Sequence, residues 1–427
     1  MTQQKAIGPH TGTPRTEPAK TRSSDRYIFA AGSLTWALAQ WFLVWLFAQV
    51  GGGAAAVGQY SLTLAVVTPV FIIGQFGLRT VYLSLQTSFT WVSYLILRLI
   101  GIGISIVIVG AYYQLNPELN VRLLAAVVFV RCFDVYLDIL YARFQRENRL
   151  LLIGLHSLVH NFGTMTIAFV AIWLTESIPL TILCVGFGAM MVAVSAQRYV
   201  VKTPPEPGTI KGGYRRILRA GTPTTVSETL AALSTYLPIL FLSVIADDAT
   251  TGVFATAAYL LTAVNLSGST LKDILITSFR WTFEASGSCA LLKRAHKIAG
   301  IIMLTVGATI PIVILAGSPV LQFIYGEEFS LTYWELTILS IAMLPIASSY
   351  IYEGTLNVLN AYSGQAWIWF LACSCGVGVG LLVINTPGIP PIIGALAVAV
   401  TTGWGRFIGA FALAFRAQRR THTNKRP

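Results

Sequence analysis

Residues 119–144 read LNVRLLAAVVFVRCFDVYLDILYARF, a stretch apolar enough to lie in a membrane that nevertheless carries charged side chains in its interior. Arg131, Asp134 and Asp138 are spaced i, i+3 and i+7, so they project from one face of a helix. A charge at the centre of a membrane span costs roughly 2.5–3.5 kcal/mol on insertion scales, so these side chains must face protein or water. Two interpretations stand: an internal ion-pair ladder in which Asp134 neutralises Arg131, or one wall of a polar cavity for a charged cargo.

The composition is that of an integral membrane protein. The chain has 427 residues, of which 55% are hydrophobic and 11% charged, and its mean hydropathy is +0.69. Soluble domains have about 25% charged residues. The net charge of +12 lies mainly in tails and loops beside apolar spans, so it indicates membrane topology and we expect no nucleic-acid partner. The five cysteines show no disulfide framework or metal-ligand spacing.

The hydropathy pattern predicts an all-α, polytopic membrane protein with about twelve transmembrane helices in two six-helix lobes around a central cavity. At roughly 20 apolar residues per crossing, the spans fall near residues 27–49, 57–79, 89–113, 119–143, 150–174, 178–200, 221–245, 252–275, 296–317, 331–357, 365–385 and 389–414. Lys and Arg gather in both tails and in alternate turns, which places both termini in the cytoplasm.

The chain divides into five predicted regions. A disordered basic cytoplasmic tail (1–26) precedes an N-terminal six-helix lobe (27–200); a cytoplasmic linker (201–216) joins it to a C-terminal six-helix lobe (217–415), and a basic cytoplasmic tail (416–427) ends the chain. The linker reads VKTPPEPGTIKGGYRR, in which Pro and Gly interrupt any helix. The two halves share a faint repeat in which Gly58 matches Gly252 and Gly74 matches Gly268. Six spans is an even number, so the lobes share one orientation, with a cavity between them.

Several other side chains stand out within the predicted spans. Arg98, Arg406 and Glu228 are charged, and Arg98 has a packing or snorkelling role as its alternative. Trp41 belongs to a row of aromatic residues that would stack on sugar rings in a cavity or form a packing stripe. His156 and His160 are spaced i, i+4, but no third ligand accompanies them, so we predict no metal site. The sequence contains no GxxxxGK[ST], GxSxG or HExxH motif, and the outer loops are too short to hold a catalytic centre; we therefore expect no enzyme.

Three stretches resemble the polysaccharide and O-antigen flippases of the multidrug/oligosaccharidyl-lipid/polysaccharide (MOP) exporter superfamily. Residues 58–84 read GQYSLTLAVVTPVFIIGQFGLRTVYLS, with a Gly-Tyr start and a Gly-Leu-Arg turn. Residues 238–243 read PILFLS and precede Asp247 and Gly252. Residues 323–365 contain YGEEF before the tenth span and LNAYSGQ after it. The match is a diffuse pattern that spans most of the membrane region.

The resemblance implies a flippase in the cell (plasma or inner) membrane that moves a polyprenyl-diphosphate-linked oligosaccharide to the outer leaflet by alternating access. Its partners would be that lipid, membrane lipids and polysaccharide-assembly enzymes. Substrate-binding candidates are Arg98, Arg131, Arg406 and Trp41, and coupling or ion-pair candidates are Asp134, Asp138 and Glu228. No cofactor is implied beyond H⁺ or Na⁺ coupling. The alternatives are an ion-coupled exporter of small amphipathic molecules, a glycan polymerase or ligase, and a scaffold for glycosyltransferases.

Overall fold

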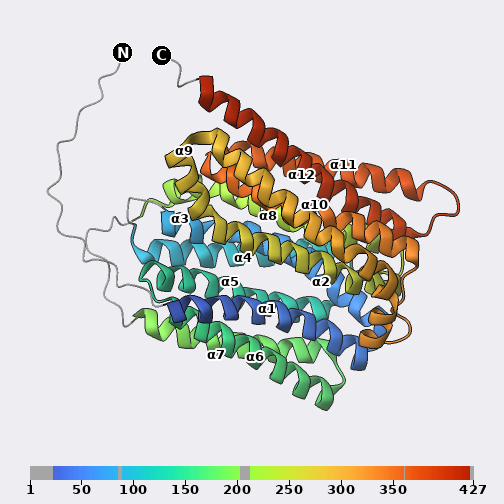
Figure 1. Ribbon diagram of the computed structural model, residues 1–427. Helices are drawn as coiled ribbons and strands as arrows, with labels where there is room; N and C mark the ends of the chain where they lie inside the picture. Colours follow the sequence, from blue (N-terminus) through green and yellow to red (C-terminus); the bar gives the residue numbers. More distant parts are fainter. Residues whose placement is uncertain (1–22, 85–88, 202–211, 360, 424–427) are drawn as a thin grey trace.

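A computed structural model describes residues 23–84, 89–201, 212–359 and 361–423, which form a bundle of long, nearly parallel helices (Figure 1). The helices are α1 (Ser23–Val50), α2 (Gly53–Gly74), α3 (Leu78–Ser84), α4 (Trp91–Leu115), α5 (Val121–Arg146), α6 (Leu150–Thr175), α7 (Ile178–Val201), α8 (Tyr214–Ile245), α9 (Asp248–Tyr325), α10 (Tyr333–Val358), α11 (Tyr362–Ile384) and α12 (Pro391–Thr423). The predicted all-α membrane fold is confirmed, because the apolar spans become helices of membrane-crossing length.

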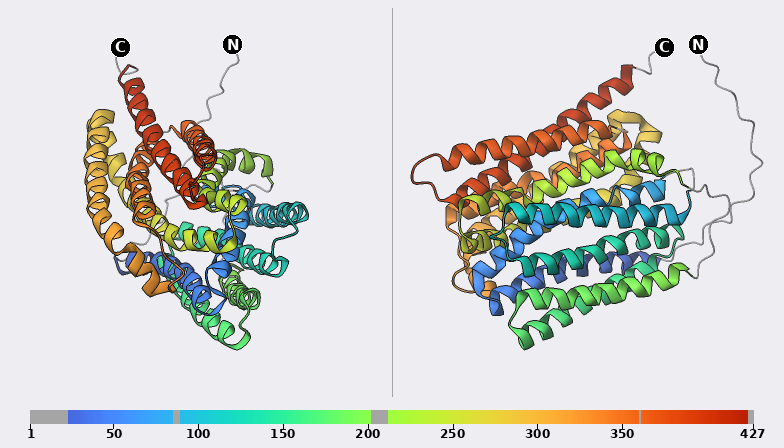
Figure 2. Two further views of the ribbon diagram at one scale, coloured as in Figure 1. Left: turned by 90° about the vertical axis from the view of Figure 1, so that its right-hand side faces the viewer. Right: turned by 180° about the vertical axis from the view of Figure 1, so that it is seen from behind.

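Eleven segments of the described chain are long and apolar enough to cross a membrane. The helix that falls outside this set is α5, whose charged face lowers its hydropathy although it lies alongside the others (Figures 1 and 2). Its place inside the bundle, in contact with α2, α3, α4, α6 and α7, compensates for the polar face. Together with α5, these segments give the predicted twelve crossings.

Helix α9 comprises two spans joined by a reversal. It runs for 78 residues, and Gly287 interrupts it with φ 79° and ψ −178°. A positive φ of this size favours glycine, which lacks the Cβ that would clash. Gly287 falls between the predicted eighth and ninth spans, residues 252–275 and 296–317. Residue 287 thus provides the turn between the predicted eighth and ninth spans.

The helices associate in two groups that follow the chain order. In the first, α1 contacts α6, α5 contacts α7, and α2 contacts α4 and α5; in the second, α10 contacts α9 and α12, while α11 contacts α12 and α8. The two groups meet mainly where α2 touches α8 and α9, and where α3 touches α8 (Figure 2). These groups correspond to the predicted six-helix lobes.

The predicted N-terminal tail and the linker fall largely outside the described residues, whereas most of the predicted C-terminal tail belongs to α12. Helix α1 already begins at Ser23, and α12 continues through the predicted C-terminal boundary to Thr423. The extension of α12 has a simple reason: its Arg and Gln residues are good helix formers, so the end of the apolar span is not the end of the helix. Residues 1–22, 202–211 and 424–427 lie outside the described part of the chain.

The lobes are joined at the end opposite the termini by a reciprocal crossing of α2 and α9. A Cβ at Gly58 would overlap the carbonyl of Asp248, and one at Gly252 would overlap the carbonyl of Ala54. Nearby, Gln59 Nε2 donates to Asp248 Oδ2 at 2.9 Å, and the backbone N–H of Ala54 donates to Glu328 Oε1 at 2.7 Å. The two glycines matched in the sequence repeat therefore meet at one close backbone contact, which only residues without a side chain allow.

Replacing Gly58 with Val should separate this end of the bundle, because the new side chain has no room beside Asp248. Overpacking of this kind costs about 1–3 kcal/mol. The fraction of molecules in which α2 and α9 remain in close contact should therefore fall roughly 5- to 150-fold. The measurement is disulfide formation between Gln59→Cys and Asp248→Cys with the native cysteines replaced by serine. Unchanged cross-linking after Gly58→Val would contradict the role assigned to the crossing, and Gly103→Val, which points into open space, is the matched control.

Candidate functional site

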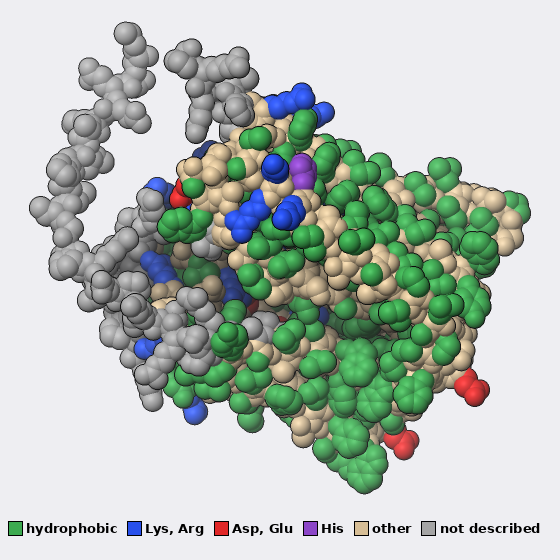
Figure 3. Space-filling view, in the orientation of Figure 1, with side chains coloured by type: hydrophobic (Ala, Val, Ile, Leu, Met, Phe, Trp, Pro, Cys, Tyr) green, Lys and Arg blue, Asp and Glu red, His purple; other side chains and the backbone are tan. Residues whose placement is uncertain are grey.

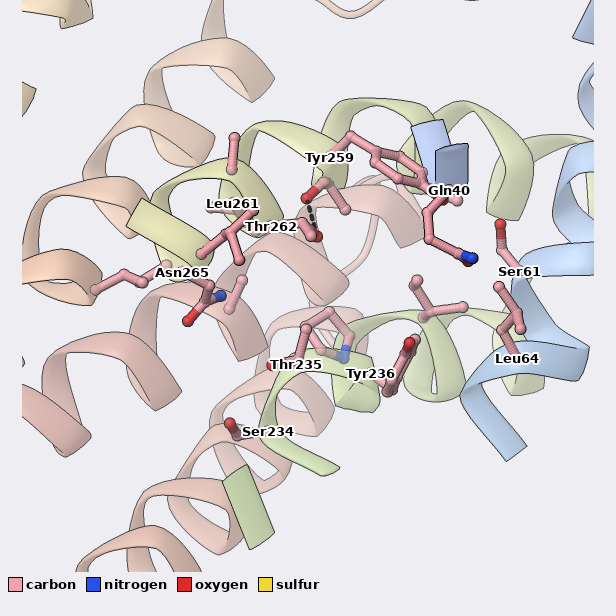
Figure 4. A pocket seen from close by; sticks show the side chains of 18 of the residues that line it. Gln40, Ser61, Leu64, Ser234, Thr235, Tyr236, Tyr259, Leu261, Thr262 and Asn265 are labelled. Atoms are coloured by element: carbon pink, nitrogen blue, oxygen red, sulfur yellow. Dashed lines mark hydrogen bonds between the residues drawn. The ribbon is translucent and has the colours of Figure 1, made fainter. Parts of the chain in front are cut away.

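A central cavity of about 520 Å³ lies between the lobes, and helices of both lobes line it. Residues of α1, α2 and α5 form one side; residues of α8, α9, α10, α11 and α12 form the other. Polar side chains from several helices face the same space, including Gln40 of α1, Ser61 of α2, Tyr236 of α8 and Asn265 of α9 (Figure 4). Most of the remaining lining is apolar or aromatic. The predicted cavity between two lobes is therefore present.

Arg131 stands on the N-terminal side of this cavity. Its Nη1 lies 3.2 Å from Asp134 Oδ2, and the other oxygen of that carboxylate lies 3.6 Å from His160 Nε2 on α6. The Arg131 side chain is 12% exposed and that of Asp134 is 24% exposed, so the pair is mostly buried but remains in contact with the cavity. The two interpretations of this helix face thus coincide: Arg131 is neutralised by Asp134 and it also lines the cavity.

A second cavity continues from Arg131 along α5 and is called the N-lobe cleft. It measures about 410 Å³, and its lining includes Arg79, Arg131, Asp134, Asp138 and His160. The i, i+3, i+7 spacing predicted one shared face for the three charged residues of α5, and all three line this cleft. It contacts α1, α2 and α6 and reaches Leu266 of α9, which also lines the central cavity.

Arg406 occupies the opposite wall, where an acid, an amide and two aromatic rings hold it while its Nη2 has no hydrogen-bond partner among the described residues. Its Nε lies 2.6 Å from Glu353 Oε1, and its Nη1 lies 3.4 Å from Asn265 Oδ1. The guanidinium carbon lies 3.9 Å from the ring centroids of both Tyr350 and Trp369. A guanidinium between two aromatic faces gains cation–π attraction while keeping its charge. Arg406 is therefore a fixed positive group at the cavity edge.

Arg98 does not reach the cavity and is not assigned to substrate binding. Its side chain is 0% exposed, and its Nη2 lies 2.9 Å from Asp138 Oδ2. The same carboxylate uses its other oxygen to bind Arg79 Nη1 at 2.8 Å. Arg98 thus fixes α4 to α5 from within the core, which corrects the expectation that it faces the cargo path. The sequence of α4 is apolar around its circumference and does not reveal which face is buried.

The remaining candidates take separate positions. Trp41 lines the central cavity. Glu228 of α8 is exposed and lines a third cavity of about 450 Å³, called the seam pocket, together with Arg79 and Asp138. Glu228 forms no ion pair with any described residue. The structure therefore brings Trp41, Arg131 and Arg406 to one cavity and places Glu228 at another.

Sequence reasoning did not assign three participants to the site. Glu353 binds Arg406, His160 approaches Asp134, and Arg79 shares Asp138 with Arg98. Glu353 is an acid within a predicted span, but its partner could not be named, whereas Arg79 has the position of an ordinary basic residue of a cytoplasmic turn. His156 does not join His160 at a shared ligand; its Nδ1 lies 3.0 Å from the carbonyl oxygen of Leu152.

Comparison with known proteins gives the class of fold. No known family model matches the chain. A capsular polysaccharide biosynthesis protein of Staphylococcus aureus, CapF, is 20% identical over 390 residues, which cover 90% of this chain and 95% of CapF. An outward-facing multidrug MATE transporter of the MOP superfamily has a TM-score of 0.63 at 11% identity, with coverage of 94% of this chain and 97% of that chain.

Two more solved structures agree. The lipid II flippase MurJ in an inward closed conformation has a TM-score of 0.60 at 16% identity, covering 91% of this chain and 87% of MurJ. A MOP superfamily transporter from Pyrococcus furiosus has a TM-score of 0.60 at 12% identity, covering 94% and 97%. The protein therefore has the multi-pass membrane fold of MOP-superfamily transporters. The resemblance noted in the sequence is confirmed at the level of this fold, whose solved examples here are transporters and a flippase.

The buried pair between Arg98 and Asp138 should be a determinant of stability. Replacing Arg98 with Met leaves Asp138 paired with Arg79, so the loss is one charge-assisted hydrogen bond between α4 and α5, which contributes about 1.5–3 kcal/mol. The thermal unfolding midpoint of the detergent-solubilised protein should therefore fall clearly. Arg149→Gln is the control, because Arg149 is half-exposed and surface changes of this kind stay within about 0.5 kcal/mol. Equal midpoints for both variants would argue against this role.

Proposed function

We propose that the protein is a flippase that moves a polyprenyl-diphosphate-linked oligosaccharide from the inner to the outer leaflet of the plasma membrane by alternating access. The observation that carries this proposal is the pair of arginines on opposite walls of the central cavity, Arg131 and Arg406. A diphosphate cannot cross hydrocarbon unaided, and guanidinium groups bind phosphate oxygens in two places while remaining charged when buried. The likeness to CapF over nearly the whole chain supports a role in polysaccharide export.

The cavity lining matches the other parts of such a cargo. Trp41 and Trp36 offer aromatic faces on which sugar rings stack, and hydroxyl and amide groups of Thr235, Thr262 and Asn265 offer hydrogen bonds to sugar hydroxyls. Apolar side chains make up most of the rest and suit the polyprenyl tail or its first isoprene units. The lipid II flippase of the same fold supports a lipid-linked cargo for this cavity.

The carboxylates would hold the arginines while the cavity is empty. Asp134 already pairs with Arg131, and a cargo phosphate would compete for the same guanidinium. Protonation or sodium binding at Asp134 or Glu228 would alter that competition and couple transport to an ion gradient. Basic residues gather at the end of the bundle that carries both termini, which supports cytoplasmic termini and assembly enzymes acting on that side.

Replacing Arg131 with Ala should reduce flipping of a fluorescent polyprenyl-diphosphate oligosaccharide in reconstituted vesicles by at least about tenfold. A hydrogen bond to a charged group contributes about 1.5–3 kcal/mol, which corresponds to roughly 10- to 150-fold. Arg131→Lys should retain part of the rate, since it keeps the charge and loses the two-point contact. Arg149→Gln is the reconstitution control. Parental flipping by Arg131→Ala would remove the diphosphate role of this residue.

An exporter of small amphipathic molecules is the second candidate. The apolar and aromatic character of most of the lining and the MATE transporters among the similar folds favour it. It predicts efflux of lipophilic cationic dyes from cells that produce the protein, and two buried arginines in the cavity would disfavour such cations. Dye efflux without any flipping of the labelled lipid would select this second function.

A further inference from the structure

Arg79 sits where the two lobes meet at the end of the bundle that carries the termini. It follows a sharp turn between α2 and α3 in which Phe76 and Gly77 have φ 51° and φ 58°. Gly221 of α8 packs so closely against the Phe76 carbonyl that a Cβ at position 221 would overlap it. This close contact between lobes fixes the start of α3 and therefore the position of Arg79.

The side chain of Arg79 is held by α5 but remains accessible. Its Nη1 lies 2.8 Å from Asp138 Oδ1, its Nη2 lies 3.0 Å from Gln145 Oε1, and 35% of the side chain is exposed. Two nitrogens of a planar guanidinium are thereby aligned by fixed acceptors. A group in this state is oriented before any ligand arrives.

The charges of Arg79, Arg98 and Asp138 do not cancel. Asp138 is a single carboxylate between two guanidinium groups, those of Arg79 and Arg98. Arg98 is fully buried and has no other acid within ion-pair distance among the described residues, so Asp138 must remain paired with it. One positive charge is therefore in excess, and it resides on the accessible residue, Arg79. An excess cation at the wall of a polar cavity attracts anions.

Arg79 also joins the cavities into one path. It lines both the seam pocket and the N-lobe cleft, which share Asp138 as well. The cleft shares Arg131 with the central cavity, and Arg131 lies seven residues from Asp138 on one face of α5, or about 10 Å along the helix. Figure 3 shows basic side chains in a hollow at this end of the molecule. The polar surface thus leads from Arg79 inward to Arg131.

An acid from the other lobe faces this surplus charge. Glu228 of α8 lines the seam pocket opposite Arg79, is exposed, and has no ion-pair partner among the described residues. A phosphate group and the Glu228 carboxylate would compete for the same guanidinium. Glu228 is therefore placed to oppose an anion that arrives and to replace it after it has moved on.

We propose that Arg79 is the cytoplasmic capture site for the phosphate groups of an anionic lipid headgroup, with Glu228 as its competitor across the seam. The inference rests on the proposed flippase function and adds a site upstream of the central cavity. The headgroup binds Arg79 first, displaces part of its contact with Asp138 and Gln145, and then passes along α5 to Arg131. The chemistry recognised is a phosphate or diphosphate, which both a lipid and a free anion carry.

The test measures initial flipping rates in inside-out vesicles over a range of concentrations of diphosphate-linked and monophosphate-linked polyprenyl oligosaccharide. Arg79→Gln should raise the half-saturating concentration of the diphosphate lipid by about tenfold, since one charge-assisted contact is lost. The preference for diphosphate over monophosphate should fall as well, and Arg79→Lys should restore part of it. A merely structural role would affect both lipids equally.

Two further arms complete the experiment. Glu228→Gln should lower the half-saturating concentration by about threefold, because a like charge facing the headgroup is removed. Inorganic pyrophosphate at millimolar concentration should compete with the lipid in the parent protein and much less in Arg79→Gln. Equal competition in both proteins would place the diphosphate elsewhere and overturn the inference.

The outcomes separate this inference from the proposed function. If the parent protein flips neither lipid, the proposed function fails. If the parent flips them and Arg79→Gln has parental half-saturating concentrations and parental lipid preference, the capture site fails while the flippase stands. Arg149→Gln, on the same side of the bundle and paired with Glu147, is the matched loss of one exposed arginine and should leave both quantities unchanged.

Discussion

A guanidinium group inside a membrane protein must have its charge balanced nearby, and this constraint organises the whole interior. Arg98, Arg131 and Arg406 each lie within 3.2 Å of a carboxylate oxygen. In a medium of low dielectric constant an unpaired ion is far less stable than in water, so each arginine fixes an acid on its own or a neighbouring helix. The pairs differ in their place: the pair of Arg98 lies in the core, whereas those of Arg131 and Arg406 border the central cavity. That difference, not the presence of charge, separates a structural pair from the pairs that we propose for cargo binding.

The close contact between the lobes at the end opposite the termini depends on an internal repeat. Gly58 and Gly252 are equivalent positions of the two halves, and each lies against the backbone of the other's helix. The lobes can approach this closely at one end only because neither position has a side chain. At the other end the equivalent symmetry is broken, since α3 is a separate short helix after a turn, whereas the residues at the same offset in the second half, 272–278, belong to the continuous helix α9. Both arginines bound to Asp138, Arg79 and Arg98, therefore come from the N-terminal lobe, while the second lobe contributes Glu228 to the seam pocket.

Much of this arrangement could be predicted from the sequence, and the parts that could not have physical reasons. Long apolar runs fix the spans, and the Arg131–Asp134 contact follows from their spacing on one helix. The partner of Arg98 lies 40 residues away and that of Arg406 lies 53 residues away, on helices whose rotation an apolar sequence does not specify. Arg79 was hidden for another reason: a basic residue at a cytoplasmic turn is ordinary, and only the position of α3 at the lobe seam distinguishes it.

The balance of charge along the cavities has an energetic consequence for a carrier. Arg79, Arg131 and Arg406 line the three cavities together with Asp134, Asp138 and Glu228, and Arg98 and Glu353 are paired with members of this set. These four arginines and four acids sum to zero when His160 is neutral. An empty carrier of this kind reorients without moving net charge, whereas the loaded form carries the charge of its cargo. For the proposed diphosphate, two negative charges would leave a compartment that is electrically negative. The transmembrane voltage contributes about 2.3 kcal/mol per charge at 100 mV, so outward movement would be electrogenic and downhill by about 4–5 kcal/mol.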